Sequence, residues 1–254
     1  MSIPSAFSLA GKRVLVTGAN TGLGQAICLA VGRAGGAVIG VGRSSMDETA
    51  AAMKETGAGF EPVSCDLADH AAAQAMLDEV WSTSGPLDGL VNNAGIIRRQ
   101  DATEFSEADW DDVMNVNLKS LFFLCQTFGR HAVEENREGR IVNIASLLSF
   151  QGGIRVASYT ASKHGVLGIT RLLACEWAAK GVNINAVAPG YIETNNTEAL
   201  RADPDRSAAI LGRIPAGRWG RPEDIGDAAV FLLAPASNYM HGAVIPVDGG
   251  WLAR

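Results

Sequence analysis

The sequence predicts an α/β fold in which one doubly wound domain carries a seven-stranded parallel sheet flanked by helices. Short runs rich in Val and Ile alternate with longer helical patterns along all 254 residues, which is typical of βαβ units. Most of these runs lack apolar–polar alternation, as expected for strands that helices cover on both faces. No Pro/Ser linker, charge block or repeat divides the chain, so residues 1–254 are expected to form a single domain.

The strands and helices follow each other in a regular order. Strands are expected at 13–17, 37–42, 60–64, 88–92, 140–145, 182–188 and 243–247. Helical patterns occupy 22–34, 47–56, 69–83, 106–136, 157–180 and 223–234. Thr103 and Ser106 stand just before the fourth pattern, with acidic residues in its first turn, and mark its start.

The composition limits the classes of function. The net charge of -6 argues against binding to nucleic acid or to an anionic membrane, since both require a positive surface. An anionic small substrate stays possible, because a few arginines can bind it locally. No run of eighteen apolar residues and no signal-like N-terminus is present, so the cytoplasm is the expected location.

Cysteines and histidines show no spacing that suggests a metal or disulfide. The four cysteines are scattered, and three lie in apolar contexts that predict buried free thiols. The histidines are expected at the surface or in packing contacts, and no metal is predicted. The cysteines are Cys28, Cys65, Cys125 and Cys175, and the histidines are His70, His131, His164 and His241.

A glycine-rich turn follows the first strand directly and precedes a helical pattern. Glycines here permit a tight turn and let backbone amides approach a pyrophosphate at the positive end of the helix, as in a Rossmann-type dinucleotide site. The spacing G-x-x-x-G-x-G differs from G-x-G-x-x-G, and glycines alone would also suit an ordinary turn. The expected cofactor-binding residues of the turn are Gly18, Asn20, Thr21, Gly22, Leu23 and Gly24.

This glycine spacing resembles that of the short-chain dehydrogenases/reductases, and the resemblance extends over nearly the whole chain. It implies that Asn92-Asn93-Ala94-Gly95 supports the sheet and the adenosine side of the cofactor, and that Asp66-Leu67 contacts adenine. Without the resemblance, NNAG is a turn and Asp66 a helix cap. The cofactor contacts expected on this basis are Asp66, Leu67, Asn93, Ala94, Gly95, Pro189, Gly190, Ile192 and Thr194, with Tyr159 and Lys163.

The end of the second strand bears on the choice of nicotinamide cofactor. NAD-selective enzymes usually place Asp or Glu there to accept hydrogen bonds from the ribose 2′-OH. This chain has Arg43 and Ser44 instead, and an arginine can pair with a 2′-phosphate. NADP(H) is therefore favoured, and NAD(H) stays possible because a surface arginine is also common at a strand end.

Four residues suggest the chemistry of hydride transfer. Tyr159 and Lys163 are four apart in a helical pattern and share one face, and Ser146 ends the fifth strand. A lysine ammonium beside the phenol, together with the positive nicotinamide of the oxidised cofactor, would lower the pKa of the phenol from about 10 towards the operating pH. Ser146 would hold the carbonyl oxygen. The resemblance implies two further roles, in which Lys163 reaches the ribose and Asn117, within the fourth helix, carries a water of a proton relay.

A narrower resemblance, from about residue 92 onward, is to the 2-dehydro-3-deoxy-D-gluconate 5-dehydrogenase branch. Its stretches include IIRRQDATEFSEADWDDVMNVNLKS, NIASLLSFQGGIRVASYTASK and VDGGWLAR. A keto-deoxy sugar acid is the substrate this implies, and its carboxylate requires an arginine. The candidates are Arg98, Arg99, Arg155, Arg213 and Arg218, with Gln151 and Asn195 for hydroxyls; Arg99, Arg155 and Gln151 are the expected substrate contacts, beside Ser146 and Tyr159.

Other interpretations stay open at this point. Segment 190–221 interrupts the alternation and is interpreted as a lid over the substrate, or otherwise as a surface or subunit-contact insertion. A gluconate 5-dehydrogenase, a 3-ketoacyl-carrier-protein reductase and a nicotinamide-binding sensor without turnover would share the main motifs. The resemblance also implies a homotetramer, in which the C-terminal GGWLAR could cross an interface.

Overall fold

A computed structural model describes residues 4–254 and contains one seven-stranded sheet in which every neighbouring pair is parallel. The strand order is β3-β2-β1-β4-β5-β6-β7. The predicted fold class is thereby confirmed. The strands are β1 Arg13–Thr17, β2 Ala37–Gly42, β3 Phe60–Ser64, β4 Gly89–Asn92, β5 Gly139–Ile144, β6 Val182–Pro189 and β7 Val244–Val247.

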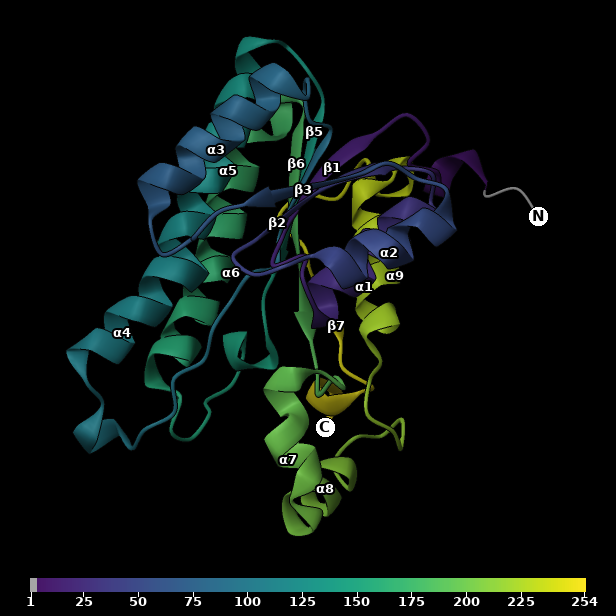
Figure 1. The fold of residues 1–254 in the computed structure, drawn as a ribbon. Helices are drawn as coiled ribbons and strands as arrows, with labels where there is room; N and C mark the ends of the chain where they lie inside the picture. Colours follow the sequence, from purple (N-terminus) through teal and green to yellow (C-terminus); the bar gives the residue numbers. More distant parts are fainter. Residues whose placement is uncertain (1–3) are drawn as a thin grey trace.

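Helices cover both faces of the sheet (Figure 1). Helices α3 (His70–Thr83), α4 (Glu107–Met114), α5 (Ser120–Glu134) and α6 (Ala157–Trp177) lie on one side. On the other side are α1 (Gly22–Arg33), α2 (Asp47–Thr56) and α9 (Pro222–Leu233). Each face of the sheet accordingly buries its own apolar cluster, with Leu90 and Ile141 in one and Val91 and Val142 in the other. Alternation along β4 and β5 thus divides the core between two layers.

The single helix predicted over 106–136 is wrong in one respect. A π-helical turn, Asn115–Lys119, separates α4 from α5. Ser106 is the N-cap, and its hydroxyl accepts a hydrogen bond from the Asp109 amide at 3.1 Å. A π-turn inserts one residue into an otherwise helical segment, and such insertions are frequent at functional sites. Apolar periodicity does not reveal it, because every residue of the turn is compatible with a helix.

Segment 190–221 forms a separate lobe beyond the carboxyl ends of the strands, as Figure 1 shows below the sheet. It contains α7 (Glu198–Ala202) and α8 (Pro204–Leu211). Its small core joins Ile210, Ile214 and Trp219 to Trp251 from the C-terminus. Trp251, in the C-terminal stretch GGWLAR, thus packs against the lobe of its own chain.

The remaining expectations concern single residues and spans. Cys28 and Cys125 are buried, whereas Cys65 is partly exposed and Cys175 exposed, so two rather than three thiols are fully buried. Within residues 4–254 no helix is both long and apolar enough to cross a membrane.

Candidate active site

A large cavity opens at the carboxyl edge of the sheet, where open α/β sheets bind ligands. Its volume is about 960 Å³, and it extends from the glycine turn after β1 to the lobe 190–221. Of the residues predicted to bind the cofactor, all except Gly24 line this cavity. They are Gly18, Asn20, Thr21, Gly22, Leu23, Arg43, Ser44, Asp66, Leu67, Asn93, Ala94, Gly95, Tyr159, Lys163, Pro189, Gly190, Ile192 and Thr194.

The glycine turn and the loop after β4 are built as one unit. The Thr17 hydroxyl accepts hydrogen bonds from the amides of Asn93 and Ala94, both at 3.0 Å. The Asn93 side-chain amide donates in return to the Thr17 carbonyl at 2.9 Å. Gly18 has φ of +67°, and a Cβ there would lie 2.9 Å from the Asn93 amide nitrogen. Asn93 therefore holds the turn in a conformation that requires glycine.

The start of α1 suits a pyrophosphate group. Its N-cap, Thr21, makes no side-chain hydrogen bond to the helix, and no acidic residue lies in the first turn. The backbone amides of that turn are thus free of a capping side chain at the positive end of the helix dipole. Gly22 has φ of +57°, and a Cβ there would meet no atom nearer than Thr194 Cγ2 at 3.7 Å. The space next to these amides is therefore open to a ligand. These residues fit a dinucleotide cofactor.

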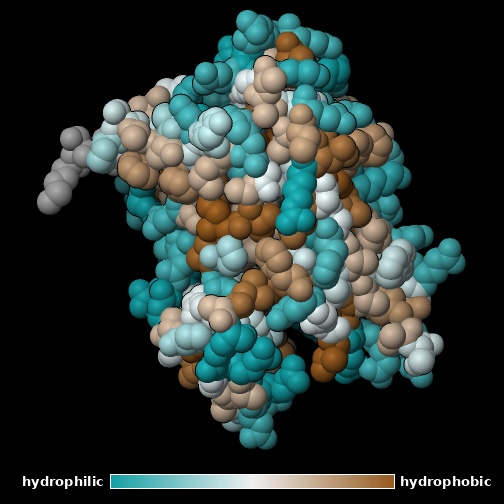
Figure 2. All heavy atoms as spheres, turned by 180° about the vertical axis from the view of Figure 1, so that it is seen from behind, coloured by the Kyte–Doolittle hydropathy of each residue, from teal (hydrophilic) through white to brown (hydrophobic). Residues whose placement is uncertain are grey.

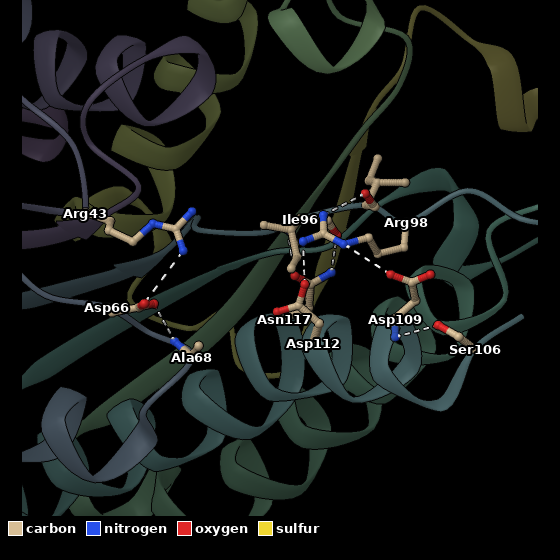
Figure 3. A network of polar contacts seen from close by, with 10 residues as sticks. Arg43, Asp66, Ala68, Ile96, Arg98, Ser106, Asp109, Asp112 and Asn117 are labelled. Carbon is tan, nitrogen blue, oxygen red and sulfur yellow. Dashed lines mark hydrogen bonds and ion pairs between the residues drawn. The ribbon is translucent and has the colours of Figure 1, made fainter.

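Arg43 and Ser44 line the cavity beside the glycine turn. The Arg43 guanidinium lies 3.6 Å from the Asp66 carboxylate, and both side chains are largely exposed (Figure 3). An ion pair so exposed contributes about 0–1 kcal/mol and exchanges easily for another anion. Asp66 does not cap α3; it accepts from the Ala68 amide, while Asp69 is the N-cap. The Asn20 side-chain amide donates to Ser44 Oγ at 2.8 Å.

Ser146, Tyr159 and Lys163 meet in the same cavity. Ser146 follows β5, and α6 carries Tyr159 and Lys163 one turn apart, with Lys163 Nζ 5.6 Å from the centre of the phenol ring. Lys163 is buried, and one of its ammonium hydrogens is donated to the Ile144 carbonyl at 2.6 Å. The ammonium thus keeps two further donors for a ligand in the cavity.

Burial dominates the protonation of both side chains. Desolvation raises the pKa of the Tyr159 phenol above its ordinary value, while the Ser146 hydroxyl and the Arg99 charge lower it to a smaller extent. Desolvation likewise lowers the pKa of Lys163 to about 8. The expected lowering of this pKa requires the Lys163 ammonium together with the positive nicotinamide of a bound oxidised cofactor, and the protein groups on their own leave the pKa of the phenol raised.

Asn117 lies behind the cavity wall rather than in it. Its side-chain oxygen accepts from the Ile96 amide at 2.8 Å, and its amide nitrogen donates to the Ile96 carbonyl at 3.0 Å (Figure 3). The amide nitrogen also donates to Ser162 Oγ at 3.3 Å. Both amide hydrogens are thus used. If Asn117 holds a water, the contact has to come from its main chain or from the remaining lone pair of its side-chain oxygen.

The arginines predicted to bind the substrate differ in whether they line the cavity and whether they form ion pairs with carboxylates. Arg99 lines the cavity, and so does Arg98, which forms ion pairs with Asp109, at 3.5 Å, and with Asp112. Arg155, an expected substrate contact, is not among the residues that line the cavity, and its exposed guanidinium pairs with Asp101 at 3.1 Å. Arg218 similarly pairs with Asp224. Other candidates that line the cavity are Arg213, Gln151 and Asn195.

Several lining residues were missed in the sequence. Trp251 reaches the cavity from the C-terminus, and its indole packs against Tyr191 and under the Arg213 guanidinium, 3.9 Å from the ring centre. Its indole nitrogen donates to Gln151 Oε1 at 3.3 Å. Arg206, on α8, is a further lining cation. Trp251 carries no local signal, because its place depends on packing with residues far away in the chain.

No group of three or more His, Cys, Asp or Glu in the range 4–254 is arranged to hold a metal ion. His131 packs on Trp81 and contacts Asp78, and His70 packs on Phe123.

Comparisons with known proteins extend these findings. A family model described as Enoyl-(Acyl carrier protein) reductase matches residues 18–252. A 2-dehydro-3-deoxy-D-gluconate 5-dehydrogenase of Escherichia coli (strain K12) is 54% identical over 99% of this chain and 100% of its own. A gluconate 5-dehydrogenase of Gluconobacter oxydans (strain 621H) is 40% identical over 98% of each chain. A solved Agrobacterium tumefaciens structure with bound NADP, provisionally assigned as a 2-deoxy-D-gluconate 3-dehydrogenase, is 59% identical, with a TM-score of 0.95 over 99% of this chain and 100% of that chain.

The fold and the cavity define an α/β oxidoreductase with a dinucleotide-type site. The chain belongs to the short-chain dehydrogenase/reductase family, so the resemblance inferred from its motifs is confirmed. Membership of this family makes it an oxidoreductase acting on CH–OH groups, and the interpretation as a sensor without turnover is not supported.

Proposed function

We propose that the protein is an NADP(H)-dependent oxidoreductase that interconverts a ketone and a secondary alcohol on a keto-deoxy sugar acid. The specific activity proposed is that of a 2-dehydro-3-deoxy-D-gluconate 5-dehydrogenase. The observation that carries the proposal is the meeting of Ser146, Tyr159 and Lys163 in a cavity that also holds arginines and the open start of α1. The relatives named above support the substrate class.

Each catalytic side chain has a role that follows from its place. A bound nicotinamide cofactor supplies the hydride acceptor or donor. During reduction of a ketone, negative charge grows on the carbonyl oxygen; Ser146 donates a hydrogen bond to this oxygen, and the Tyr159 phenol gives it a proton. The Lys163 ammonium stabilises the resulting phenolate, and its remaining donors would hold hydroxyls of the ribose of a bound cofactor. Asn117 fixes the loop at Ile96, and the relay water that the family resemblance implies would bind its main chain or the remaining lone pair of its side-chain oxygen.

The pH dependence of ketone reduction follows from these protonation states. Reduction requires a protonated phenol, which burial favours by raising the pKa of Tyr159, and a charged lysine, whose pKa is lowered to about 8. We therefore expect kcat/KM for reduction to be constant near neutrality and to fall as pH rises through about 8. Initial rates of NADPH oxidation between neutral and alkaline pH measure this, and a rate that rises with pH would contradict the assignment.

Cofactor preference is expected to depend on Arg43. Replacement by alanine removes the guanidinium available to a 2′-phosphate and should weaken NADPH binding by about 10-fold, with NADH binding unchanged. Titrations of protein fluorescence with each cofactor measure this. Arg33→Ala, which removes an exposed arginine at the far end of α1, is the matched control. An equal loss for both cofactors would show that Arg43 does not recognise the 2′-phosphate.

A substrate panel tests the proposed reaction. Purified protein with NADPH or NADH is assayed against 2,5-diketo-3-deoxygluconate, 4-deoxy-5-ketouronate, 5-ketogluconate and an acetoacetyl-carrier thioester. We expect the highest kcat/KM for a keto-deoxy sugar acid. Preference for 5-ketogluconate would favour the gluconate 5-dehydrogenase alternative, which the Gluconobacter oxydans relative supports. Preference for the thioester, or no turnover of any sugar acid, would refute the proposal.

We further propose a cytoplasmic homotetramer. Large apolar side chains are exposed on two neighbouring helices, Trp110 on α4 at 40% and Leu172 on α6 at 50%. Figure 2 shows apolar residues gathered across the middle of the face turned away in Figure 1. Surfaces of this kind suit subunit contacts. Light scattering during size-exclusion chromatography determines the mass, and a monomer would contradict the proposal.

A further inference from the structure

Two consecutive arginines, Arg98 and Arg99, follow β4 and line the same cavity, but their surroundings differ. Figure 3 shows the surroundings of Arg98. Arg98 is neutralised by Asp109 and Asp112 of α4. Arg99 forms no ion pair with any carboxylate of residues 4–254, and its one polar contact there is a hydrogen bond of 3.4 Å to the Asn196 carbonyl. A contact at this limiting distance is weak. Arg99 is thus a cation whose charge is uncompensated at the edge of the cavity.

The backbone on both sides of Arg99 is held in place. Asn117 binds both the amide and the carbonyl of Ile96 through hydrogen bonds of 2.8 and 3.0 Å. On the other side, the Gln100 amide donates to the Arg155 carbonyl at 3.1 Å. The pair of aspartates on α4 fixes Arg98 between these two points. Ordering a recognition residue before the ligand arrives reduces the entropic cost of binding.

The charge of Arg99 also acts on the phenol of Tyr159. This charge lowers the pKa of Tyr159, although the two side chains share no hydrogen bond. The two other lining arginines without a carboxylate partner, Arg206 and Arg213, both belong to the lobe 190–221, and the planar face of Arg213 is stacked on Trp251. Arg99 is therefore the lining cation without a carboxylate partner that belongs to the loop after β4 rather than to the lobe.

We propose that Arg99 binds the carboxylate of the substrate, and that the Asn196 carbonyl gives up its hydrogen bond when that carboxylate arrives. This inference rests on the proposed function, because it requires an anionic ketone substrate. Arg98 is bridged to two carboxylates, and Arg155 does not line the cavity, so Arg99 is the arginine of this region that offers the cavity an uncompensated charge. A guanidinium suits this role, since its fork of donors matches the two oxygens of a carboxylate.

The experiment compares Arg99→Ala and Arg99→Lys with Arg155→Ala, using the keto sugar acid that the wild-type protein reduces fastest. We expect Arg99→Ala to lower kcat/KM by roughly 10- to 100-fold, mainly through KM, and Arg99→Lys to lose less. Added ethylguanidinium should restore part of the activity of Arg99→Ala, which a purely structural role would not allow. Arg155→Ala should behave as wild type, because its main-chain carbonyl is retained.

NADPH affinity and thermal unfolding of each variant show whether the site is intact. Wild-type KM in Arg99→Ala, or a loss without rescue by ethylguanidinium, would overturn the assignment of Arg99 while leaving the proposed function standing. A wild-type protein that reduces no keto sugar acid would instead refute the proposed function itself. The two failures are thus distinguished by the wild-type assay alone.

Discussion

Replacing Tyr159 with phenylalanine is expected to lower kcat for ketone reduction by roughly 1,000-fold, because the variant has no proton to give to the carbonyl oxygen. The aromatic ring, which lies near the Lys163 ammonium, is retained. Binding of NADPH and the thermal unfolding midpoint should therefore stay close to the wild-type values. Steady-state rates, cofactor titration and differential scanning fluorimetry measure the three quantities separately.

The chain provides a matched control for this change. Tyr239 has an almost fully exposed side chain, 99%, in the connection between α9 and β7. Tyr239→Phe removes the same hydroxyl group far from the cavity and should leave all three measurements unchanged. A Tyr159→Phe variant with wild-type kcat would show that another group supplies the proton, and the proposed mechanism would then be wrong.

Most of the architecture could be predicted because its signals are local. The first three strands have the predicted bounds, and β1 and β2 are short apolar runs, whereas β3 at the edge of the sheet contains Glu61 and Pro62 and is largely exposed. The helix over 106–136 could not be predicted in full, because a π-turn changes the hydrogen-bond register of the backbone without changing the apolar pattern. Its consequence is local but important, since that turn carries Asn117 and fixes the loop after β4.

Part of the candidate site could likewise be predicted from the sequence, and part of it could not. Ser146, Tyr159 and Lys163 could be found because their spacing along the fifth strand and the next helix brings them together. The sequence could not distinguish Arg99 from Arg155 as the residue that binds the substrate carboxylate, because the distinction depends on which of the two forms an ion pair with an acidic side chain. Asp101 takes the side chain of Arg155, and such pairings depend on tertiary structure rather than on local pattern.

Gly24 shows how a motif residue can act without touching the ligand, and its replacement should have the second large effect. A Cβ at this position would lie 1.9 Å from the Gly18 carbonyl oxygen and 2.6 Å from the Asn93 side-chain nitrogen. Neither group can move without opening the turn that Asn93 holds. We expect Gly24→Ala to lower the free energy of unfolding by about 3 kcal/mol or more and to abolish NADPH binding. Chemical denaturation and cofactor titration measure the two effects.

Gly168, in the middle of α6, is the matched control for Gly24. Both glycines are helical, but a Cβ at Gly168 would meet no atom within 4 Å. Gly168→Ala should therefore stabilise the protein by about 0.5–1 kcal/mol, because alanine is the better helix former, and NADPH binding should not change. If Gly24→Ala were tolerated as well as Gly168→Ala, close packing of α1 on the turn would not be what shapes the cofactor site. The glycine spacing would then reflect the ligand rather than the contact between Gly24 and Gly18.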